Sequence, residues 1–270
     1  MRIVVPAFVP DSRGNRLKEY TLKKLAKEVT PDRWLYLCGP QEAARQIGML
    51  GTCAPEELTD EQKEKWTHKF HLTESDKAEL RPLCEVLEEV LSLTAKGDVD
   101  FAIAFDWYKA PDGGDPRHWP NTPSGELVYR SKYYSEGAAR SKARRELVEK
   151  FSDLIAKHPI LRACHNVMTV PGHKADGQSF GERLADKVAV KIGKPLIRTE
   201  SPGGTRPQAK EGAAIIADGH FESPGRIAGD VIILDDVYRS GATMHAVARA
   251  AKRAGARRVF GLAAVRTMRN

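Results

Sequence analysis

The stretch from Val231 to Thr243 constrains the fold of this chain more than any other. It reads Val-Ile-Ile-Leu-Asp-Asp-Val-Tyr-Arg-Ser-Gly-Ala-Thr, so an apolar run leads directly into two adjacent carboxylates and then a short polar loop. An uninterrupted apolar run predicts a strand buried on both faces, as in the parallel sheet of an α/β protein. Asp235 and Asp236 then fall at the carboxyl end of that strand, where such sheets bind ligands.

A helix is expected to begin near Ala242, directly after this polar loop. Its free N–H groups and the positive end of its dipole favour a phosphate. The strand exit therefore offers acceptors for sugar hydroxyls beside a phosphate cradle, and a ribose 5-phosphate needs both. An acidic pair also occurs in Mg²⁺ sites of receiver and phosphatase folds, or in a solvated turn, but those sites do not need the Gly-Ala-Thr step.

The rest of the chain alternates between strand and helix patterns, which predicts a mostly parallel sheet flanked by helices. We expect further strands at residues 2–9, 34–38, 99–108, 167–171, 195–199 and 258–265. We expect helices at residues 17–29, 42–50 and 60–71, around 147–155, and onward from Phe180. Pro82 suits the first turn of another helix, whose apolar stripe reaches Leu91 before Gly97 closes it. Residues 109–124 form a loop or domain junction.

A second phosphate site is predicted in the loop between residues 171 and 179. Gly172, His173 and Lys174 follow a predicted strand, and Ser179 with Glu182 forms a capping box for the next helix. A Gly-bearing loop with basic side chains between strand and helix suits a pyrophosphate, although such loops are often purely structural.

A cationic, Gly/Pro-rich loop follows at residues 200–210 and suits a mobile lid. As a lid it would bring Arg206 and Lys210 over a pyrophosphate, stabilise developing negative charge and exclude water. An ordinary surface loop with incidental charge is the alternative.

Composition places the chain among soluble globular proteins. The 270 residues carry a net charge of +7, which favours anionic ligands but does not separate small phosphates from nucleic acid. Four scattered cysteines without a Cys-x-x-Cys pair suggest neither a disulfide framework nor a zinc ribbon. No segment is long and apolar enough to span a bilayer, so a cytoplasmic location with free thiols is expected. His68, His71 and Cys53 could ligate a metal, but a polar helix face is the favoured interpretation.

The segment Val231–Thr243 resembles the phosphoribosyl-pyrophosphate (PRPP) signature of type I phosphoribosyltransferases. One position departs from that pattern, because Arg239 stands where a small hydroxyl residue is common. The resemblance implies a type I phosphoribosyltransferase-like α/β fold in residues 123–270. Residues 1–122 would then form an N-terminal α/β extension, or hood.

Three further segments are similar to the competence protein F-like (ComF-like) branch of that superfamily. They are Gly125–Tyr134 with its Lys-Tyr pair, the Val170-Pro171 strand end, and Arg198 with Thr205-Arg206-Pro207-Gln208. In this chain Arg206 and Pro207 stand between Thr205 and Gln208 of that last element. The zinc-binding Cys cluster of that family has no counterpart in residues 1–120.

The resemblance implies a role for each matching residue. Asp235 and Asp236 would bind the ribose hydroxyls, support positive charge on the ring and contribute to Mg²⁺ binding. The 5-phosphate loop would comprise Val237, Tyr238, Arg239, Ser240, Gly241, Ala242 and Thr243. Gly172, His173 and Lys174 would contact the pyrophosphate with Mg²⁺, Arg198 and Gln208 would contribute to substrate binding, and Arg206 and Lys210 would close over the site. A nitrogen nucleophile would displace pyrophosphate at C1.

The sequence does not identify the acceptor that supplies this nitrogen. Trp107 and Tyr133 are candidates for stacking on a base, although such aromatics are more often packing residues. The alternative function is a PRPP- or nucleotide-binding accessory protein without turnover, acting in DNA uptake or regulation. Basic residues could contact nucleic acid, but one solvated helix face is the favoured interpretation of Arg140, Lys142, Arg144 and Arg145. The oligomeric state stays open.

Overall fold

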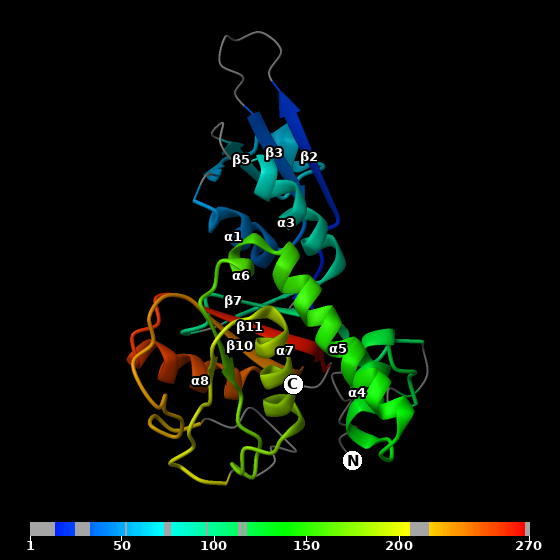
Figure 1. Cartoon of the computed structure of the whole chain (residues 1–270). Coiled ribbons are helices and arrows are strands. Elements are labelled where there is room, and N and C mark those ends of the chain that lie inside the picture. The colour runs from blue at the N-terminus through cyan, green and yellow to red at the C-terminus, as the bar shows by residue number, and fades with distance from the viewer. Residues whose placement is uncertain are drawn as a thin grey trace, which may run out of the picture.

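A computed structural model describes residues 14–24, 33–51, 53–72, 77–95, 97–112, 115, 118–205 and 216–267 of the chain. These residues form two sheets with helices packed on them (Figure 1). The strand predicted at residues 2–9 lies outside the described residues.

The larger sheet has seven strands and contains the strand of the acidic pair. In spatial order its strands are β1 (Gly14–Asn15), β6 (Leu91–Leu93), β7 (Phe101–Trp107), β11 (Val259–Arg266), β10 (Val231–Tyr238), β8 (Asn166–Thr169) and β9 (Leu196–Ile197). From β7 to β9 every neighbouring pair is parallel, and the pairs β1–β6 and β6–β7 at the other edge are antiparallel. The predicted mostly parallel sheet flanked by helices is confirmed.

Helices cover both faces of this sheet. One face packs against α4 (Pro123–Tyr133), α5 (Ala138–Lys157), α6 (Pro159–Arg162) and α7 (Phe180–Ile192), and the other packs against α8 (Ala242–Arg253). Ile232 and Leu234 of β10 enter the first core, whereas Val231 and Ile233 enter the second. The apolar run of β10 is therefore buried on both sides, as the sequence predicts for a central parallel strand. None of the described helices is long and apolar enough to cross a membrane.

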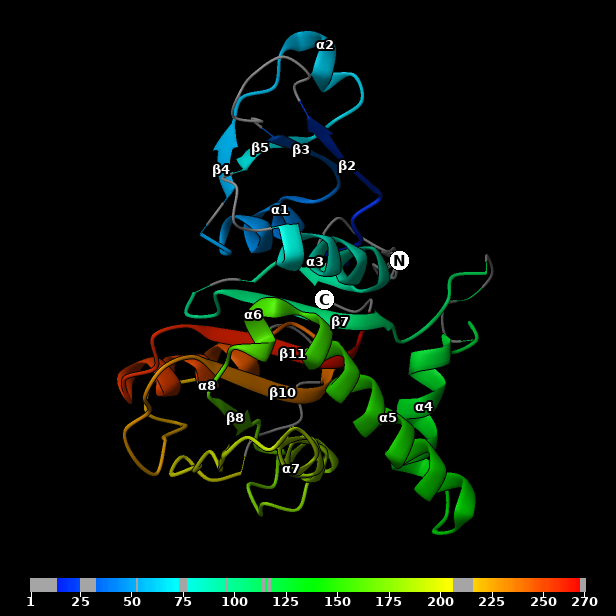
Figure 2. The ribbon, with the colours of Figure 1, turned by 45° about the horizontal axis from the view of Figure 1, so that its top comes forward.

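The smaller sheet has four antiparallel strands from the N-terminal part of the chain. In spatial order they are β2 (Glu19–Lys24), β3 (Arg33–Cys38), β5 (His68–Leu72) and β4 (Cys53–Glu56). Two helices, α1 (Gln41–Gly48) and α3 (Lys77–Glu89), pack on one face of this sheet and share a core with it. Figure 2 shows α1 and α3 between the two sheets.

The division between the sheets does not coincide with the expected domain boundary after residue 122. Strands β6 and β7 precede that residue but belong to the larger sheet, and β7 pairs in parallel with β11. The smaller sheet spans only residues 19–72. The division of the chain into an N-terminal hood of residues 1–122 and a second domain of residues 123–270 therefore stays a prediction.

Two predicted helices are wrong. Residues 19–24 of the expected helix 17–29 form strand β2, because Tyr20 and Leu22 alternate with polar residues and all six residues pair with β3. Within residues 60–71, only α2 (Asp60–Lys63) is helical. Its Thr59–Gln62 capping box supports one turn, and residues 68–72 then form β5 between β3 and β4. His68 and His71 consequently lie on a strand.

The helix around Pro82 also differs from its prediction. It begins at Lys77 or earlier, so Pro82 lies inside α3 and not in its first turn. The helix ends at Glu89 and Leu91 begins β6, well before Gly97. The other helix predictions are confirmed, namely those at residues 42–50 and 147–155 and those beginning at Phe180 and Ala242.

Candidate functional site

The acidic pair lies within β10 rather than at its end. The strand continues to Tyr238, and Val237 and Tyr238 pair with Val265 and Arg266 of β11. Val237 and Tyr238, the first two residues of the predicted 5-phosphate loop 237–243, therefore lie on the strand and not in the loop, and their role in phosphate binding stays a prediction. Only residues 239–241 connect β10 to α8.

β10 is longer than its neighbour on the other side. The pairing of β10 with β8 ends at Leu234 and Thr169, so residues 235–238 pair only with β11. On the β8 side, the overhanging end of β10 faces the part of the chain that leads into α7. A Cβ atom at Gly181 would lie 3.0 Å from Asp235 Oδ1 and 3.4 Å from Asp236 Oδ1. Glycine thus lets the first turn of α7 approach both carboxylates.

The start of α8 has the form expected of a phosphate-binding helix N-terminus. Gly241 is the N-cap with φ of 79°, a left-handed conformation that favours glycine, and it makes no side-chain capping bond. A Cβ atom there would also lie 2.2 Å from the hydroxyl oxygen of Tyr238. Ser240 Oγ accepts a long hydrogen bond of 3.4 Å from the Ala242 N–H. The position of this helix start after β10 allows it to receive an anion beside the carboxylates.

The loop before α7 is anchored at its base and exposed at its tip. Ser179 caps α7, and the carboxylate of Glu182 accepts hydrogen bonds from the N–H groups of Ser179 and Gly172. The predicted capping box is confirmed. A Cβ atom at Gly172 would lie 2.6 Å from Ser179 Cβ, so this close approach also requires glycine. His173 and Lys174 are exposed, and Gly181 places their loop next to the acidic pair.

Lys132, on α4, also contacts the acidic pair. Its Nζ donates a hydrogen bond of 2.5 Å to Asp236 Oδ2, in an ion pair where Lys132 is 28% and Asp236 10% exposed at the side chain. No role for Lys132 was predicted from sequence, although it belongs to the Lys-Tyr pair that carried part of the family resemblance. Its partner is 104 positions away, so local patterns could not identify the contact.

The start of α4 fixes the position of Lys132. Thr122 caps the helix by accepting a hydrogen bond from the Gly125 N–H, and its hydroxyl donates to the carbonyl oxygen of Trp107 at the end of β7. Gly125 lies so close to the Tyr108 carbonyl that a Cβ atom would be 2.0 Å from its oxygen. The helix is thereby attached to the carboxyl end of the sheet, as Figure 2 shows.

The acidic pair and Lys132 perturb one another electrostatically. Burial raises the pKa of Asp235 well above its usual range, and the neighbouring Asp236 carboxylate raises it further. Burial alone would lower the pKa of Lys132, but its ion pair with Asp236 outweighs this effect and raises it. Burial and the nearby Tyr133 raise the pKa of Tyr108 to about 12. Asp235 is therefore favoured in its protonated form, whereas Asp236 has a cation to stabilise its charge.

A buried cation lies at the same edge of the sheet. Arg266 ends β11, and its guanidinium carbon is 5.6 Å from the ring centre of Trp107 and 5.5 Å from that of Tyr238. Trp107, a candidate base-stacking residue, thus has its ring against Arg266. Tyr133, the other candidate, is 65% exposed on α4 one residue after Lys132. Arg266 was missed because a basic residue ending an apolar strand gives no specific signal.

Among the remaining predicted site residues, Arg198 has an ion-pair partner on α7. Arg198 donates a hydrogen bond of 2.8 Å to Asp186 on α7. Arg239 follows β10 directly, and Thr243 lies in the first turn of α8. Arg206, Gln208 and Lys210 lie outside the described residues, as does the rest of the predicted lid from residue 206 to 210.

A divalent metal fits the acidic pair only together with a ligand. Among the described residues there is no cluster of three or more His, Cys, Asp or Glu side chains that could hold a metal ion. Adjacent carboxylate oxygens are nevertheless suitable donors for Mg²⁺, which is commonly bound through one or two carboxylates plus substrate phosphates and water. The residues present therefore fit a metal that arrives with a phosphorylated substrate.

Comparisons with known proteins gave matches among solved structures only. No family model and no curated protein matches the chain. A purine phosphoribosyltransferase from Pyrococcus horikoshii is 20% identical over 48% of this chain and 83% of its own, with a TM-score of 0.30. An adenine phosphoribosyltransferase from Thermoanaerobacter pseudethanolicus is 17% identical over 47% and 81%, with a TM-score of 0.31.

A third similar structure covers more of the chain. The adenine phosphoribosyltransferase from Leishmania tarentolae is 11% identical over 64% of this chain and 94% of its own, with a TM-score of 0.33. At these TM-scores the superposed parts agree only loosely. The functional proposal therefore rests on the residues of this chain.

Proposed function

We propose that this protein is a Mg²⁺-dependent phosphoribosyltransferase that binds PRPP and transfers its ribose 5-phosphate to a nitrogen nucleophile. One observation carries the proposal: two adjacent carboxylates on the overhanging end of β10 lie between the start of α8 and the first turn of α7. A sugar phosphate with a second phosphate group at C1 requires hydroxyl acceptors flanked by two anion-binding loops.

Each part of PRPP has a matching part of the site. Asp235 and Asp236 would accept hydrogen bonds from the ribose 2- and 3-hydroxyls. Residues 239–243, at the start of α8, would bind the 5-phosphate, and residues 172–174 would bind the pyrophosphate. Arg206 and Lys210 keep their proposed closing role on sequence grounds alone. The ComF-like resemblance of residues 125–270 supports this assignment, and we propose that the chain belongs to that branch.

The proposed reaction is a displacement at C1 of the ribose. The nitrogen of the acceptor forms a bond to C1 as the bond from C1 to the pyrophosphate oxygen breaks, and pyrophosphate leaves with the electron pair. The nitrogen then loses a proton to the solvent or a nearby base. Positive charge develops on the ring in the transition state, and the carboxylate of Asp236 is placed to stabilise it. When bound, Mg²⁺ would neutralise negative charge on the leaving pyrophosphate.

Lys132 sets the charge of this site before substrate binds. Its ammonium pairs with the Asp236 carboxylate, while burial raises the pKa of Asp235 and disfavours a charge there. A ribose hydroxyl that approaches Asp236 must share it with Lys132 or displace the ammonium. Displaced, the ammonium could turn toward the anionic substrate, so Lys132 is proposed as a PRPP-binding residue.

The acceptor is proposed to bind beside α4. Tyr133 is exposed there and lies one residue from Lys132, which contacts the acidic pair. An aromatic ring in this position can stack on a planar nitrogenous base. The proposed partners are therefore PRPP and a nitrogenous acceptor, in a protein expected from its sequence to be cytoplasmic.

Pyrophosphate release tests the proposal directly. The purified chain is incubated with PRPP, Mg²⁺ and a panel of nucleobases and amines, and pyrophosphate is measured with a coupled assay. We expect release that depends on one class of acceptor and is lost in the Asp235→Asn, Asp236→Asn double variant. Calorimetric binding of PRPP without release for any acceptor would instead identify the non-catalytic accessory protein. Absence of both binding and release would overturn the proposal.

A further inference from the structure

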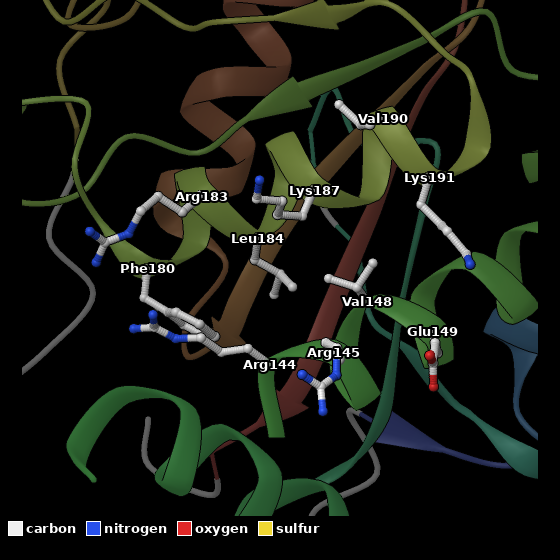
Figure 3. A pocket seen from close by; sticks show the side chains of 10 residues that line it. All are labelled: Arg144, Arg145, Val148, Glu149, Phe180, Arg183, Leu184, Lys187, Val190 and Lys191. Atoms are coloured by element: carbon white, nitrogen blue, oxygen red, sulfur yellow. The ribbon is translucent and has the colours of Figure 1, made fainter. Parts of the chain in front are cut away.

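A groove runs along the outer surface of the α5 and α7 layer (Figure 3). It has a volume of 480 Å³, and side chains from both helices line it. Val148 of α5 and Leu184 of α7 lie along it, and Phe180 lies at one end in the first turn of α7. The groove is separate from the acidic pair, but Phe180 directly precedes Gly181, which contacts both carboxylates.

An exposed apolar residue extends the groove along α7. Val190 lies toward the opposite end from Phe180 and is 75% exposed. The ten residue steps from Phe180 to Val190 span about 15 Å at the α-helical rise of 1.5 Å per residue. Apolar contacts over this length match about three turns of another helix, whose apolar side chains would repeat at the same spacing.

The groove is strongly cationic. Of its charged residues only Glu149 is acidic, whereas five are basic: Arg144, Arg145, Arg183, Lys187 and Lys191. None of the five forms a salt bridge with a carboxylate in the part of the chain that the structure describes. The pKa of Arg144 is lowered by burial and then by the nearby cations Arg140 and Arg183. Cations that repel one another around an apolar groove are complementary to an anionic partner.

We infer that this groove is a docking surface for an acidic amphipathic helix of a partner protein. The apolar face of that helix would lie along Phe180, Val148 and Val190, the partly or fully exposed apolar residues of the groove. Acidic residues on its flanks would pair with Lys187 and Lys191 on one side and with Arg145 on the other. The proposal concerns a second surface of the molecule and does not depend on the acidic pair.

The apolar groove favours a helix over a nucleic acid strand. Non-specific single-strand binding relies on exposed aromatic rings for base stacking. Phe180 is the groove's single aromatic residue, and the guanidinium of Arg144 lies over its ring at 5.6 Å. A polynucleotide would also leave the exposed side chain of Val190 without an apolar contact.

Peptide binding to the full-length chain tests the inference. The probe is a fluorescein-labelled helical peptide of about 15 residues with Leu on one face and Glu elsewhere, a length that helix formation requires. A scrambled peptide of the same composition has the same charge but no apolar face. Fluorescence anisotropy should show that the chain binds the amphipathic peptide about tenfold or more tightly than the scrambled one, with an affinity that falls as salt is added.

Variants locate the binding surface. Two groove variants should each lower the affinity for the amphipathic peptide by about tenfold or more. One is the double variant Lys187→Glu, Lys191→Glu, and the other is Val190→Asp. These side chains are exposed, so the fold should tolerate the changes. Lys142→Glu with Lys157→Glu is the matched control, because it reverses two exposed charges of α5 outside the groove and should leave binding unchanged.

Four results would overturn the inference. Both peptides could bind equally well, or the groove variants could bind like the wild type. A labelled oligothymidylate could bind more tightly than the peptide and lose its affinity in Lys187→Glu with Lys191→Glu, which would identify a nucleic-acid surface. The chain could also self-associate and become monomeric on Val190→Asp, and the occupant would then be a second copy.

Discussion

Lys132 Nζ lies 2.5 Å from Asp236 Oδ2, and this ion pair joins the last turn of α4 to the overhanging end of β10. The helix is also held by its capped start near Trp107 and Tyr108, by Val128 in the core, and by hydrogen bonds from Arg140 and Arg144 of α5 to the Ser131 carbonyl. One charge pair therefore links the position of the proposed acceptor-binding helix to the proposed donor site. Changes to either residue should affect both stability and ligand binding.

Removing the cation of this pair should destabilise the protein. We expect Lys132→Met to lower the free energy of unfolding by about 2–4 kcal/mol at pH 7, because it leaves Asp236 buried without its partner. Urea unfolding measures the change. The double variant Lys132→Met, Asp236→Asn should recover most of the loss, and Lys142→Met, an exposed change on α5, should be within about 0.5 kcal/mol of wild type. Equal losses in the single and double variants would contradict the assignment.

Removing the charge from Asp235 should stabilise the protein without ligand. Its folded-state pKa lies above the unfolded value, so its contribution to stability is complete below about pH 4 and is lost as the pH rises toward the folded-state pKa. Asp235→Asn has no such loss, and we expect it to be more stable than wild type by about 1–2 kcal/mol at pH 8. Urea unfolding at pH 4 and pH 8 should show that the advantage appears only at the higher pH. If Asp235→Asn differed from wild type in its free energy of unfolding by the same amount at both pH values, this would count against a raised pKa of Asp235.

Asp230 should contribute stability with the opposite pH dependence. Burial would raise the pKa of this carboxyl, but hydrogen bonds from Arg257 and Arg258 outweigh it and lower the pKa to about 2. The contribution is present above the unfolded pKa of about 4 and is lost as the pH falls through the folded value. Asp230→Asn should therefore cost about 2 kcal/mol at pH 7 and almost nothing at pH 2. The prediction fails if denaturation measured at both pH values shows the same cost.

Binding of PRPP should depend on the acidic pair. In the presence of Mg²⁺, the double variant Asp235→Asn, Asp236→Asn should bind PRPP about tenfold or more weakly than wild type, since each hydrogen bond to a charged group contributes about 1.5–3 kcal/mol. Isothermal titration calorimetry measures the affinity. Asp218→Asn, at a side chain that is 79% exposed, is the matched control and should bind normally. Unchanged affinity in a folded double variant would remove the acids from the site.

Tyr133 should act on the acceptor and not on PRPP. Its ring is exposed on α4 and makes a ring contact with Tyr129, so Tyr133→Ala should leave the fold intact. We expect unchanged calorimetric affinity for PRPP and an acceptor KM raised by about threefold to tenfold, consistent with the loss of about 1 kcal/mol of stacking. Loss of PRPP affinity in this variant would mean that α4 completes the donor site.

The central part of the fold could be predicted because its patterns are strong and local. The apolar run of β10, the capping box before α7 and the Gly-Ala-Thr step before α8 each specify an element from adjacent residues. The helix prediction failed at residues 19–24 because their apolar spacing fits a helix as well as a strand, and pairing of β2 with β3 decided the outcome. That pairing is tertiary, and the short alternation of Tyr20 and Leu22 does not specify it by itself.

The candidate site was predictable only in part, for a similar reason. The acids and both loops could be proposed from sequence, because each follows an apolar strand pattern, and their roles stay predictions. Lys132, Gly181 and Arg266 were missed, since each acts through a partner on another element. Arg198 was expected to contribute to substrate binding, and the structure shows its ion pair with Asp186. Whether it also binds substrate stays a prediction.

The overhang of β10 beyond β8 has a consequence for how this molecule can vary. β10 has eight residues and β8 has four, and the acids occupy the stretch that β8 does not reach. The strand edge beside Asp235 and Asp236 is thus left unpaired because β8 is shorter than β10, whatever side chains the two strands carry. Two residues added to the end of β8 in a pairing conformation would cover it, even with every side chain of the site retained. Insertions near residue 170 should therefore be as damaging as loss of an acid.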